Sequence, residues 1–330
     1  MPIMTLAEIE ALALGALTEA GADPRQAAPL ARSVAETEAE GIASHGLAYL
    51  PTYVQHLGCG KVDGTAEPVV ERPRPGLVTV DARRGFAHPA IDAGFAQLIP
   101  LARSQGVALL TIRESYNCGV LGLHVWRLAE AGLVGLGFTN APASIAPSGG
   151  RVPVVGTNPI ALGAPGPDGP LLVLDQSASA IAKSEVMKHA REGRPIPEGW
   201  ALDADGAPTT DPEAGLKGSM APSGGYKGVG LALIVETFAA ALSGALLGTD
   251  AAPFSGTAGG PPRTGQAFVA IDPDPASGGA FAERMRALTD GIRAQRGARL
   301  PGDGRMAKRR RAEAEGVDVP QATLDRIAAA

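Results

Sequence analysis

Residues 111–165 read TIRESYNCGVLGLHVWRLAEAGLVGLGFTNAPASIAPSGGRVPVVGTNPIALGAP, and their alternation of apolar and polar segments points to the fold. An apolar run at 107–112 leads into a polar turn at 114–119, and a short amphipathic helix follows to about residue 132. A second apolar run, at 133–138, ends in Thr139 and Asn140, and a loop of small residues and prolines comes after it. We therefore predict a strand–turn–helix–strand unit of an α/β protein, with a ligand site at the strand ends.

The first sixty residues are predicted to be helical. Thr5 and Glu8 have the spacing of a capping box, and Asp23 before a proline marks the start of a second helix that runs to about residue 40. A third set of apolar residues at helical spacing, 47–57, follows Ser44-His45. This pair is therefore expected at the start of a helix.

Strands and helices alternate along the rest of the chain. The proline-rich residues 67–75 predict a crossover between domains, and residues 194–212 predict a long irregular loop. Residues 229–247 are the most apolar segment, but Glu236 and several glycines interrupt them, so they predict a buried helix and not a membrane span. The other predicted strands are 77–81, 171–175 and 266–271, and the other predicted helices are 89–104, 179–191, 281–296 and 320–329.

Length and composition favour a loop-rich globular enzyme. The chain has 330 residues, of which 45% are hydrophobic, which is enough for a large core and about two domains. The net charge of −5 argues against nucleic acid as a main partner. The basic cluster at 308–311 is expected on a solvated helix face, with a role near an anionic ligand as the alternative.

Cysteine content and the N-terminus indicate a cytoplasmic protein. Two cysteines, Cys59 and Cys118, provide neither a disulfide framework nor zinc spacing, and the acidic turns of 194–212 lack the spacing of a calcium loop, so no metal is expected. Glu8 and Glu10 replace the basic region of a signal peptide. We expect no membrane partner.

Ser44 and His45 are the first candidates for chemistry. Ser44 could simply cap a helix, and His45 could be a capping or core histidine. A serine and a histidine side by side between two glycines is, however, an unusual choice for capping alone. A helix N-terminus favours an anionic ligand and lowers the pKa of a nearby imidazole, and both effects suit a general acid or base.

A glycine-rich turn before the apolar helix is the second candidate. Gly225, Tyr226 and Lys227 lie within GGYKG at 224–228, which could cradle a phosphate or carboxylate at a helix N-terminus. The spacing is not that of a Walker motif. No strand is followed by GxGxxG, so a dinucleotide would have to bind on a non-Rossmann frame.

Four segments together resemble the malate/L-lactate dehydrogenase-like oxidoreductases: GIASHG at 41–46, the segment from TNAP at 139–142 through GTNPI at 156–160, the helix after Asp175, and GGYKG. The resemblance covers essentially the whole chain. It implies an α/β fold with a non-Rossmann, three-layer NAD(P)-binding domain and a mixed sheet, plus a helical domain built from both chain ends. It also implies a homodimer. The expected division is a helical substrate region at 1–75, an NAD(P)-binding domain at 76–290 and a C-terminal segment at 291–330 that returns to the helical region.

Three departures from the family pattern bear on the reaction. Hydroxy-acid dehydrogenases of this family usually have a proton-accepting histidine where this chain has Asn117, and an amide cannot shuttle a proton at neutral pH. Glu185 stands where many malate-type members have lysine and where the cyclic-imine reductases have an acid. Tyr49 replaces the arginine with which those reductases hold the substrate carboxylate, which leaves that role to Thr157, the glycine-rich turn or the helix start.

The resemblance also implies the cofactor site, which takes NADPH or NADH. Its residues are expected to be Asn117, Cys118, Gly119, Val120 and Leu121 at the strand-to-helix turn, Asp175, Gln176 and Ser177 at a strand end, and Gly225, Tyr226 and Lys227 of GGYKG. Arg299 and Arg305, at the two ends of a glycine-rich loop at 299–305, are expected to engage a phosphate. Each of these residues could instead have a purely structural role. Cys118 could be a packing residue, and the two arginines could serve only solubility. Glu185 could be solvated, or it could pair with Lys183 or Lys188.

These features predict an NAD(P)H-dependent reductase of a small cyclic imino acid, Δ1-pyrroline-2-carboxylate or Δ1-piperideine-2-carboxylate, that forms L-proline or L-pipecolate. His45 would donate the proton, with Ser44 and Glu185 in a relay, and Tyr49 and Thr157 would contact the substrate. The alternative is a 2-hydroxy-acid dehydrogenase of the malate, lactate, sulfolactate or ureidoglycolate type, in which His45 acts alone. A third reading is a binding protein that has kept the fold and lost activity.

Overall fold

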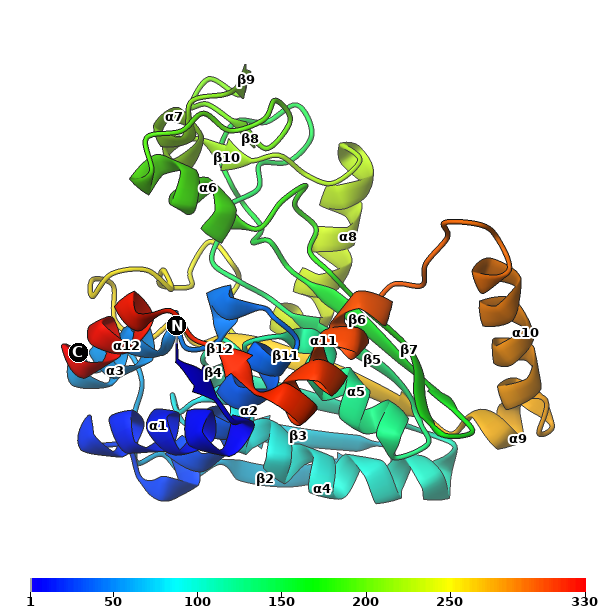
Figure 1. The fold of residues 1–330 in the computed structure, drawn as a ribbon. Coiled ribbons are helices and arrows are strands. Elements are labelled where there is room, and N and C mark those ends of the chain that lie inside the picture. Colours follow the sequence, from blue (N-terminus) through cyan, green and yellow to red (C-terminus); the bar gives the residue numbers. More distant parts are fainter. Residues whose placement is uncertain (1) are drawn as a thin grey trace.

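The computed structural model describes residues 2–330 and is built on a seven-stranded mixed sheet (Figure 1). Four strands, β3, β4, β5 and β7, run in one direction, and the other three run against them. In spatial order the strands are β2 (Val69–Arg74), β3 (Leu77–Asp81), β4 (Val107–Ser115), β11 (Thr264–Ile271), β5 (Val134–Thr139), β6 (Ile160–Gly166) and β7 (Gly169–Gln176).

The predicted strand–turn–helix–strand unit is present as β4, α5 (Leu121–Glu130) and β5. The two strands are parallel but not neighbours, because β11 lies between them and pairs antiparallel with both. The carboxyl ends of β4, β5 and β7 meet at one edge of the sheet, and the polar residues that follow them are gathered there. This is the edge at which the sequence predicts a ligand.

Two helical layers cover the sheet. Helices α4 (Ala87–Gln105) and α5 pack on one face, and α8 (Tyr226–Glu236) with the π-helical turn η2 (Thr237–Ala241) packs on the other. Strand β11 shows the alternation that this requires: Phe268 and Ala270 belong to the core under α4 and α5, and Ala267 belongs to the cluster with η2. The three-layer α/β frame is therefore confirmed.

Both chain ends build the helical part beside the sheet (Figure 1). Apolar residues of the first three helices form one buried cluster with Val319 and Ile327 from the other end of the chain. The elements are α1 (Leu6–Glu19), α2 (Pro24–Ala39), α3 (Leu50–Gly58) and α12 (Gln321–Ala328), with β1 (Ile3–Met4) paired to β12 (Val317–Asp318).

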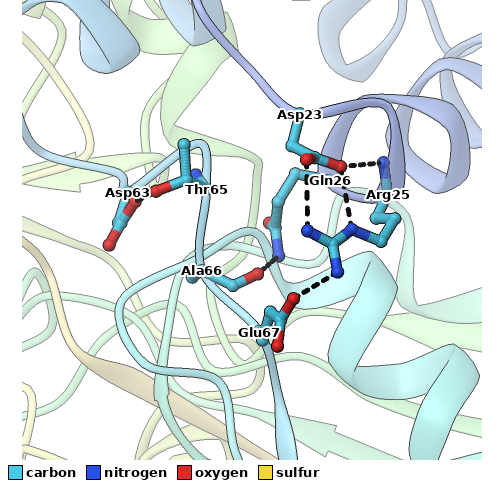
Figure 2. Close-up of polar contacts among 7 residues, drawn as sticks. All are labelled: Asp23, Arg25, Gln26, Asp63, Thr65, Ala66 and Glu67. Atoms are coloured by element: carbon cyan, nitrogen blue, oxygen red, sulfur yellow. Dashed lines mark hydrogen bonds and ion pairs between the residues drawn. The ribbon is translucent and has the colours of Figure 1, made fainter.

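Polar contacts at the start of α2 attach this helical part to the chain that enters the sheet (Figure 2). Asp23 caps α2 and binds Arg25, and Arg25 also binds Glu67 just before β2. The buried Gln26 is the stronger tie, because its amide donates to the carbonyl of Ala66 at 2.6 Å and accepts from the backbone N–H of Phe86 at 2.9 Å. One side chain thus holds both ends of the β2–β3 hairpin against α2.

A smaller lobe lies beyond the sheet edge, with a core of its own that includes the first half of α8 (Figure 1). It comprises α6 (Lys183–Arg191), α7 (Pro212–Lys217) and a three-stranded sheet of β8 (Ala201–Leu202), β9 (Pro208–Thr209) and β10 (Ser219–Met220). The remaining elements are the 3₁₀ turn η1 (Ala43–His45), α9 (Pro273–Ser277), α10 (Phe281–Arg293) and α11 (Asp303–Glu315).

Several local predictions are wrong. The segment 67–75 contains edge strand β2, Val69–Arg74, and is not a crossover between domains. Pro73 is compatible with this strand because an edge strand tolerates a missing N–H. Residues 194–212 contain β8 and β9, and β6 occupies part of the expected loop after Asn140. The segment 229–247 is not uniformly buried, since Leu233 and Ile234 are each about half exposed. The proposed division at 1–75, 76–290 and 291–330 stays a prediction.

Candidate active site

The turn that follows β4 is held by its own asparagine. The Asn117 side-chain oxygen accepts hydrogen bonds from the Gly119 N–H and from the Tyr53 hydroxyl, each at 3.2 Å. Gly119 has φ +66°, a left-handed conformation that glycine adopts without strain. Asn117 therefore shapes this turn.

Cys118 lies in the main core and is fully buried. Burial raises the pKa of its thiol to about 12, so the thiolate that a nucleophile requires is absent at neutral pH. The packing alternative fits this environment, and a contact to a cofactor would have to come from the backbone of Cys118.

His45 lies in the η1 turn, five residues before α3 begins at Leu50, so its expected place at an α-helix start is wrong. Ser44 Oγ and His45 Nδ1 are 3.0 Å apart. The pKa of His45 is lowered, chiefly by burial; Asp175 opposes this effect and Arg305 adds to it. The imidazole is consequently neutral at pH 7, with a hydroxyl at one nitrogen and a carboxylate and a guanidinium in its surroundings.

Asp175 and Arg305, both predicted for the cofactor site, come together from distant parts of the chain. Asp175 lies at the end of β7, and its Oδ2 accepts from the Gly122 N–H at 2.9 Å, in the first turn of α5. Arg305 Nη1 lies 3.4 Å from the same oxygen. Arg305 is on helix α11 and not in the glycine-rich loop where the sequence placed it. Arg299 is exposed on that loop.

A groove of about 550 Å³ lies between the end of β7 and the start of α8. Gln176, Ser177 and Lys227, all predicted, line it together with Ser179 and Ser223. Gly225 caps α8 with φ +64°, which leaves the backbone open at this end, and Tyr226 beside it is exposed. Hydroxyls, one amide and one ammonium group fit the phosphate or ribose of a dinucleotide, and the volume is that of a small-molecule site.

The two predicted substrate residues lie near this edge of the sheet. The Tyr49 hydroxyl donates to the Phe254 carbonyl at 3.0 Å, and its ring packs edge-on against Tyr53 at 4.8 Å. The Thr157 carbonyl accepts from the Ala178 N–H at 2.8 Å, and its side chain is half-buried. Tyr49 thus packs next to the residue that holds Asn117.

Glu185 is not joined to His45 in the described part of the chain. It lies on α6 in the small lobe, whereas the charges that act on His45 are those of Asp175 and Arg305. Lys183, one of its expected partners, has a pKa lowered by burial, and no ion pair joins it to Glu185 among residues 2–330. The relay of Ser44, His45 and Glu185 stays a prediction.

Asn158 is a buried hub that the sequence reading missed. Its amide donates to the Ala232 carbonyl at 3.0 Å and to Glu236 at 2.7 Å, and its oxygen accepts from the Ala141 N–H at 3.1 Å. Glu236 in turn accepts from the Gly248 N–H. Two features of the sequence could have revealed this structural network. One is Asn158 within GTNP, which we took as part of a ligand site, and the other is Glu236, which interrupts the apolar helix.

Neither a membrane span nor a metal cluster is found among residues 2–330. No helix there has the length and apolarity needed to cross a bilayer, and no three His, Cys, Asp or Glu side chains are grouped to hold a metal ion.

Comparison with known proteins identifies the family. The sequence profile of the malate/L-lactate dehydrogenase family matches residues 4–328. The (2R)-3-sulfolactate dehydrogenase (NADP(+)) of Chromohalobacter salexigens is 43% identical over 327 residues, which is 99% of this chain and 97% of that protein. A Δ1-pyrroline-2-carboxylate/Δ1-piperideine-2-carboxylate reductase of Pseudomonas aeruginosa is 39% identical over 322 residues, 97% and 96% of the two chains.

A solved structure agrees with these sequence matches. The Δ1-piperideine-2-carboxylate reductase of Pseudomonas syringae pv. tomato superposes with a TM-score of 0.93 at 40% identity, over 99% of both chains. The fold and the site define an NAD(P)H-dependent oxidoreductase of non-Rossmann architecture. The chain belongs to the malate/L-lactate dehydrogenase family.

Proposed function

We propose that this protein reduces a small cyclic imino acid with NADPH or NADH and forms L-proline or L-pipecolate. The proposal rests mainly on Asn117: it stands where the family's hydroxy-acid dehydrogenases have a proton-accepting histidine, and its amide is used to bind Gly119 and Tyr53. Several relatives at 38–42% identity and the solved structure from P. syringae are reductases of Δ1-pyrroline- or Δ1-piperideine-2-carboxylate.

His45 is the proposed proton donor. Reduction of a C=N bond needs a hydride at carbon and a proton at nitrogen, and the bound nicotinamide supplies the hydride. In the imidazolium, Nδ1–H donates to Ser44 Oγ, 3.0 Å away, which leaves Nε2 to carry the transferable proton. Because burial lowers the pKa of His45, the imidazolium is the minor form at pH 7, and once formed it is a stronger acid that gives up its proton readily.

The rest of the site follows from this assignment. We assign the cofactor to the Asn117–Leu121 turn and to Asp175, Gln176, Ser177, Lys227 and Arg305. Thr157 and Tyr49 face the substrate in this proposal, and its carboxylate is held by Thr157 and the start of α8. Glu185 completes the relay only if the small lobe and the η1 turn approach each other when ligands bind.

A sulfolactate-type 2-hydroxy-acid dehydrogenase is the second candidate. The relative from C. salexigens, at 43% identity, favours it. Two cations of α11 near the η1 turn also favour this candidate. Arg305 lowers the pKa of His45, and Lys308 Nζ lies 2.9 Å from the position that a Cβ on Gly41 would occupy. Two cations suit a substrate that carries two acidic groups.

Oxidation of NADPH, followed by its absorbance, separates the two candidates. The purified chain is offered Δ1-pyrroline-2-carboxylate, Δ1-piperideine-2-carboxylate, pyruvate, oxaloacetate and sulfopyruvate. We expect turnover with the imines and loss of at least about a hundredfold in kcat for His45→Ala. Turnover of the keto acids alone would refute the imine assignment. Binding of NADPH without turnover of any of the five would favour the reading of a binding protein.

We further propose a cytoplasmic homodimer. Exposed apolar side chains on α8 and the segment after it, among them Leu233, Ile234 and Leu242, support the dimer. Sedimentation of the purified chain tests it, because a monomer at micromolar concentration would contradict the proposal.

A further inference from the structure

Two buried histidines lie directly behind the turn that we assign to the cofactor. His88, on α4, and His124, on α5, are each 3% exposed, and their ring centroids are 5.6 Å apart. The chain has five histidines in all, and neither of these two has a part in the proposed reaction. A buried pair of titratable rings at such a place needs a physical explanation.

His124 holds one end of a peptide group in the turn. Its Nε2 lies 2.9 Å from the Cys118 carbonyl oxygen, and because a carbonyl only accepts, this nitrogen carries the proton. The N–H of the same planar peptide belongs to Gly119 and donates to the Asn117 side chain at 3.2 Å. The Cys118–Gly119 peptide is therefore clamped at both ends, by a side chain on each side.

His88 contacts the next residue of the turn. A Cβ added to Gly119 would lie 3.4 Å from His88 Nε2 and 3.7 Å from Ser33 Oγ, so the imidazole backs directly onto the turn. The left-handed conformation of Gly119 places this backbone against the ring. The two histidines thus contact consecutive residues of the turn, His124 at Cys118 and His88 at Gly119.

A cavity of about 240 Å³ opens behind the pair. Both His88 nitrogens and His124 Nδ1 are buried without a hydrogen-bond partner in the described chain, and both residues line this cavity. The cavity walls carry positively and negatively charged side chains from three helices. Asp92 forms ion pairs with Arg32, at 2.7 Å, and with Arg127, at 2.8 Å. These groups are Arg32 and Glu36 from α2, Asp92 from α4, and Arg127 and Glu130 from α5.

We propose that His124, supported by His88, is a positioning residue that fixes the Cys118–Gly119 peptide for cofactor binding. This inference rests on the proposed cofactor role of the Asn117–Leu121 turn. Neutral His124 sets the direction of the peptide plane, and with it the direction of the backbone groups that the turn presents at the sheet edge. His124 acts through the backbone and touches neither cofactor nor substrate.

A matched pair of variants tests the clamp. In His124→Gln the side-chain amide can take the place of Nε2–H and still donate to Cys118, whereas in His124→Asn the amide is too short to reach it. We expect H124N to raise the dissociation constant and KM for NADPH about tenfold, with kcat at saturating NADPH within about threefold of wild type. H124Q should restore most of the affinity. Equal values for wild type, H124N and H124Q, or equal losses in both variants, would overturn the proposal.

A measurement on the unmodified protein covers the case in which H124N does not fold. With ¹⁵N-labelled histidine, the His124 ring should show the neutral Nε2–H tautomer at pH 7, and addition of NADPH should shift its resonances. An imidazole that shows the other tautomer, or that does not respond to bound NADPH, would refute the positioning role. Failure of wild type to bind NADPH would refute the proposed function instead, so the two outcomes can be told apart.

Discussion

Asn158 shows that a residue in a functional-looking motif can be structural. It is fully buried, has φ +36° and makes hydrogen bonds to the loop at Ala141 and to α8. Its neighbour Thr157 is half-buried at the sheet edge. Two adjacent residues therefore have different roles, because the chain turns one side chain inward and leaves the next near the proposed ligand.

The adjacent pair makes a direct prediction. Asn158→Ala should lower the free energy of unfolding by about 3 kcal/mol, because it removes three buried hydrogen bonds and leaves Glu236 Oε2 and the Ala141 N–H without their Asn158 partner. Thr157→Val should change stability by less than about 1 kcal/mol and mainly raise KM for the substrate. Urea unfolding and steady-state kinetics of both variants check this. A larger stability loss in Thr157→Val than in Asn158→Ala would contradict it.

The buried histidine pair predicts a loss of stability in acid. Burial lowers the pKa of His124 to about 4 and the pKa of His88 well below its ordinary range. The unfolded chain binds these protons near pH 6.5 and the folded chain does not, so stability falls as the pH drops from about 6.5 to about 4. For His124 alone the loss is about 3 kcal/mol.

Urea midpoints at pH 7.5, 5.5 and 4.5 test this dependence. His124→Gln should lose less stability over that range than wild type, since it no longer takes up the proton on unfolding. The comparison with the variant is needed because other charged groups, Arg32, Asp92, Arg127 and Glu130, face the same cavity. Glu36 also lies there, and because burial raises its pKa, its protonation makes the protein more stable as the pH falls. Parallel pH profiles for wild type and variant would show that His124 is not the cause.

At the scale of elements, the start of α8 depends on close packing of the backbone. A Cβ on Gly228 would lie 2.5 Å from the Ser223 carbonyl oxygen and 2.8 Å from that of Ala178. Gly230, one half-turn further, has no atom within 4 Å of that position. Gly228 is therefore required, because the backbone of Ser223 and Ala178 leaves no room for a Cβ there, whereas Gly230 is not required by packing.

These two glycines predict opposite effects. Gly228→Ala should destabilise the protein by about 2 kcal/mol or more and weaken NADPH binding, because backbone atoms beside Lys227 must shift. Within a single subunit Gly230→Ala should stabilise the protein by about 0.5–1 kcal/mol, since alanine is the better helix former. Because Gly230 lies four residues from both Tyr226 and Ile234, on the face proposed for the dimer, this comparison is made at concentrations where the subunits are separate. Thermal melting and NADPH titration of the two variants measure both effects. Similar changes in the two would refute the packing argument.

Helix α11 is very polar, and ion pairs hold it against α2 and the end of β7. Arg309 lies 3.9 Å from Glu36 on α2 and 3.8 Å from Glu40 at the C-cap of that helix, and it stacks over the Trp126 ring. Part of the basic cluster at 308–311 is therefore inside an interface and not on a fully solvated face. The same helix carries Arg305 to Asp175 and so completes the candidate cofactor site.

For the whole molecule, one apolar surface stands out. Leu233, Ile234 and Leu242, on α8 and at the end of η2, are 50–53% exposed, and Tyr226 and Leu247 of the same segment are exposed as well. Side chains of this kind, grouped on one element, are typical of a subunit interface. This apolar surface is the face that we expect a second copy to cover.

Charges placed on this surface should separate the subunits. We expect Leu233→Lys combined with Ile234→Lys to shift the protein from dimer to monomer in sedimentation at micromolar concentration, because a buried unpaired lysine is costly. Leu288→Lys is the control, since Leu288 is 56% exposed on α10 and outside this surface. A monomeric wild type, or a dimer that survives the double substitution, would exclude this surface as the interface.

The sequence alone determined the elements with strong local signals. The capping box at Thr5, the cap at Asp23 and the apolar runs of β3, β4, β5, β7 and β11 depend on neighbouring residues, and they appear as predicted. The family motifs predicted the three-layer frame and the helical part that is built from both chain ends. Weak or broken patterns failed, as in the proline-containing edge strand β2 and the glycine-rich strand β6.

Only the tertiary structure decided which polar residues meet. Strand β11 enters between β4 and β5 from more than 120 residues away, and Arg305 reaches Asp175 across 130 residues of sequence. Burial then assigned roles that residue type leaves open: it keeps Cys118 a thiol, makes Asn158 structural and leaves His88 and His124 neutral behind the turn. Long-range packing and desolvation depend on the whole fold, and local sequence does not encode them.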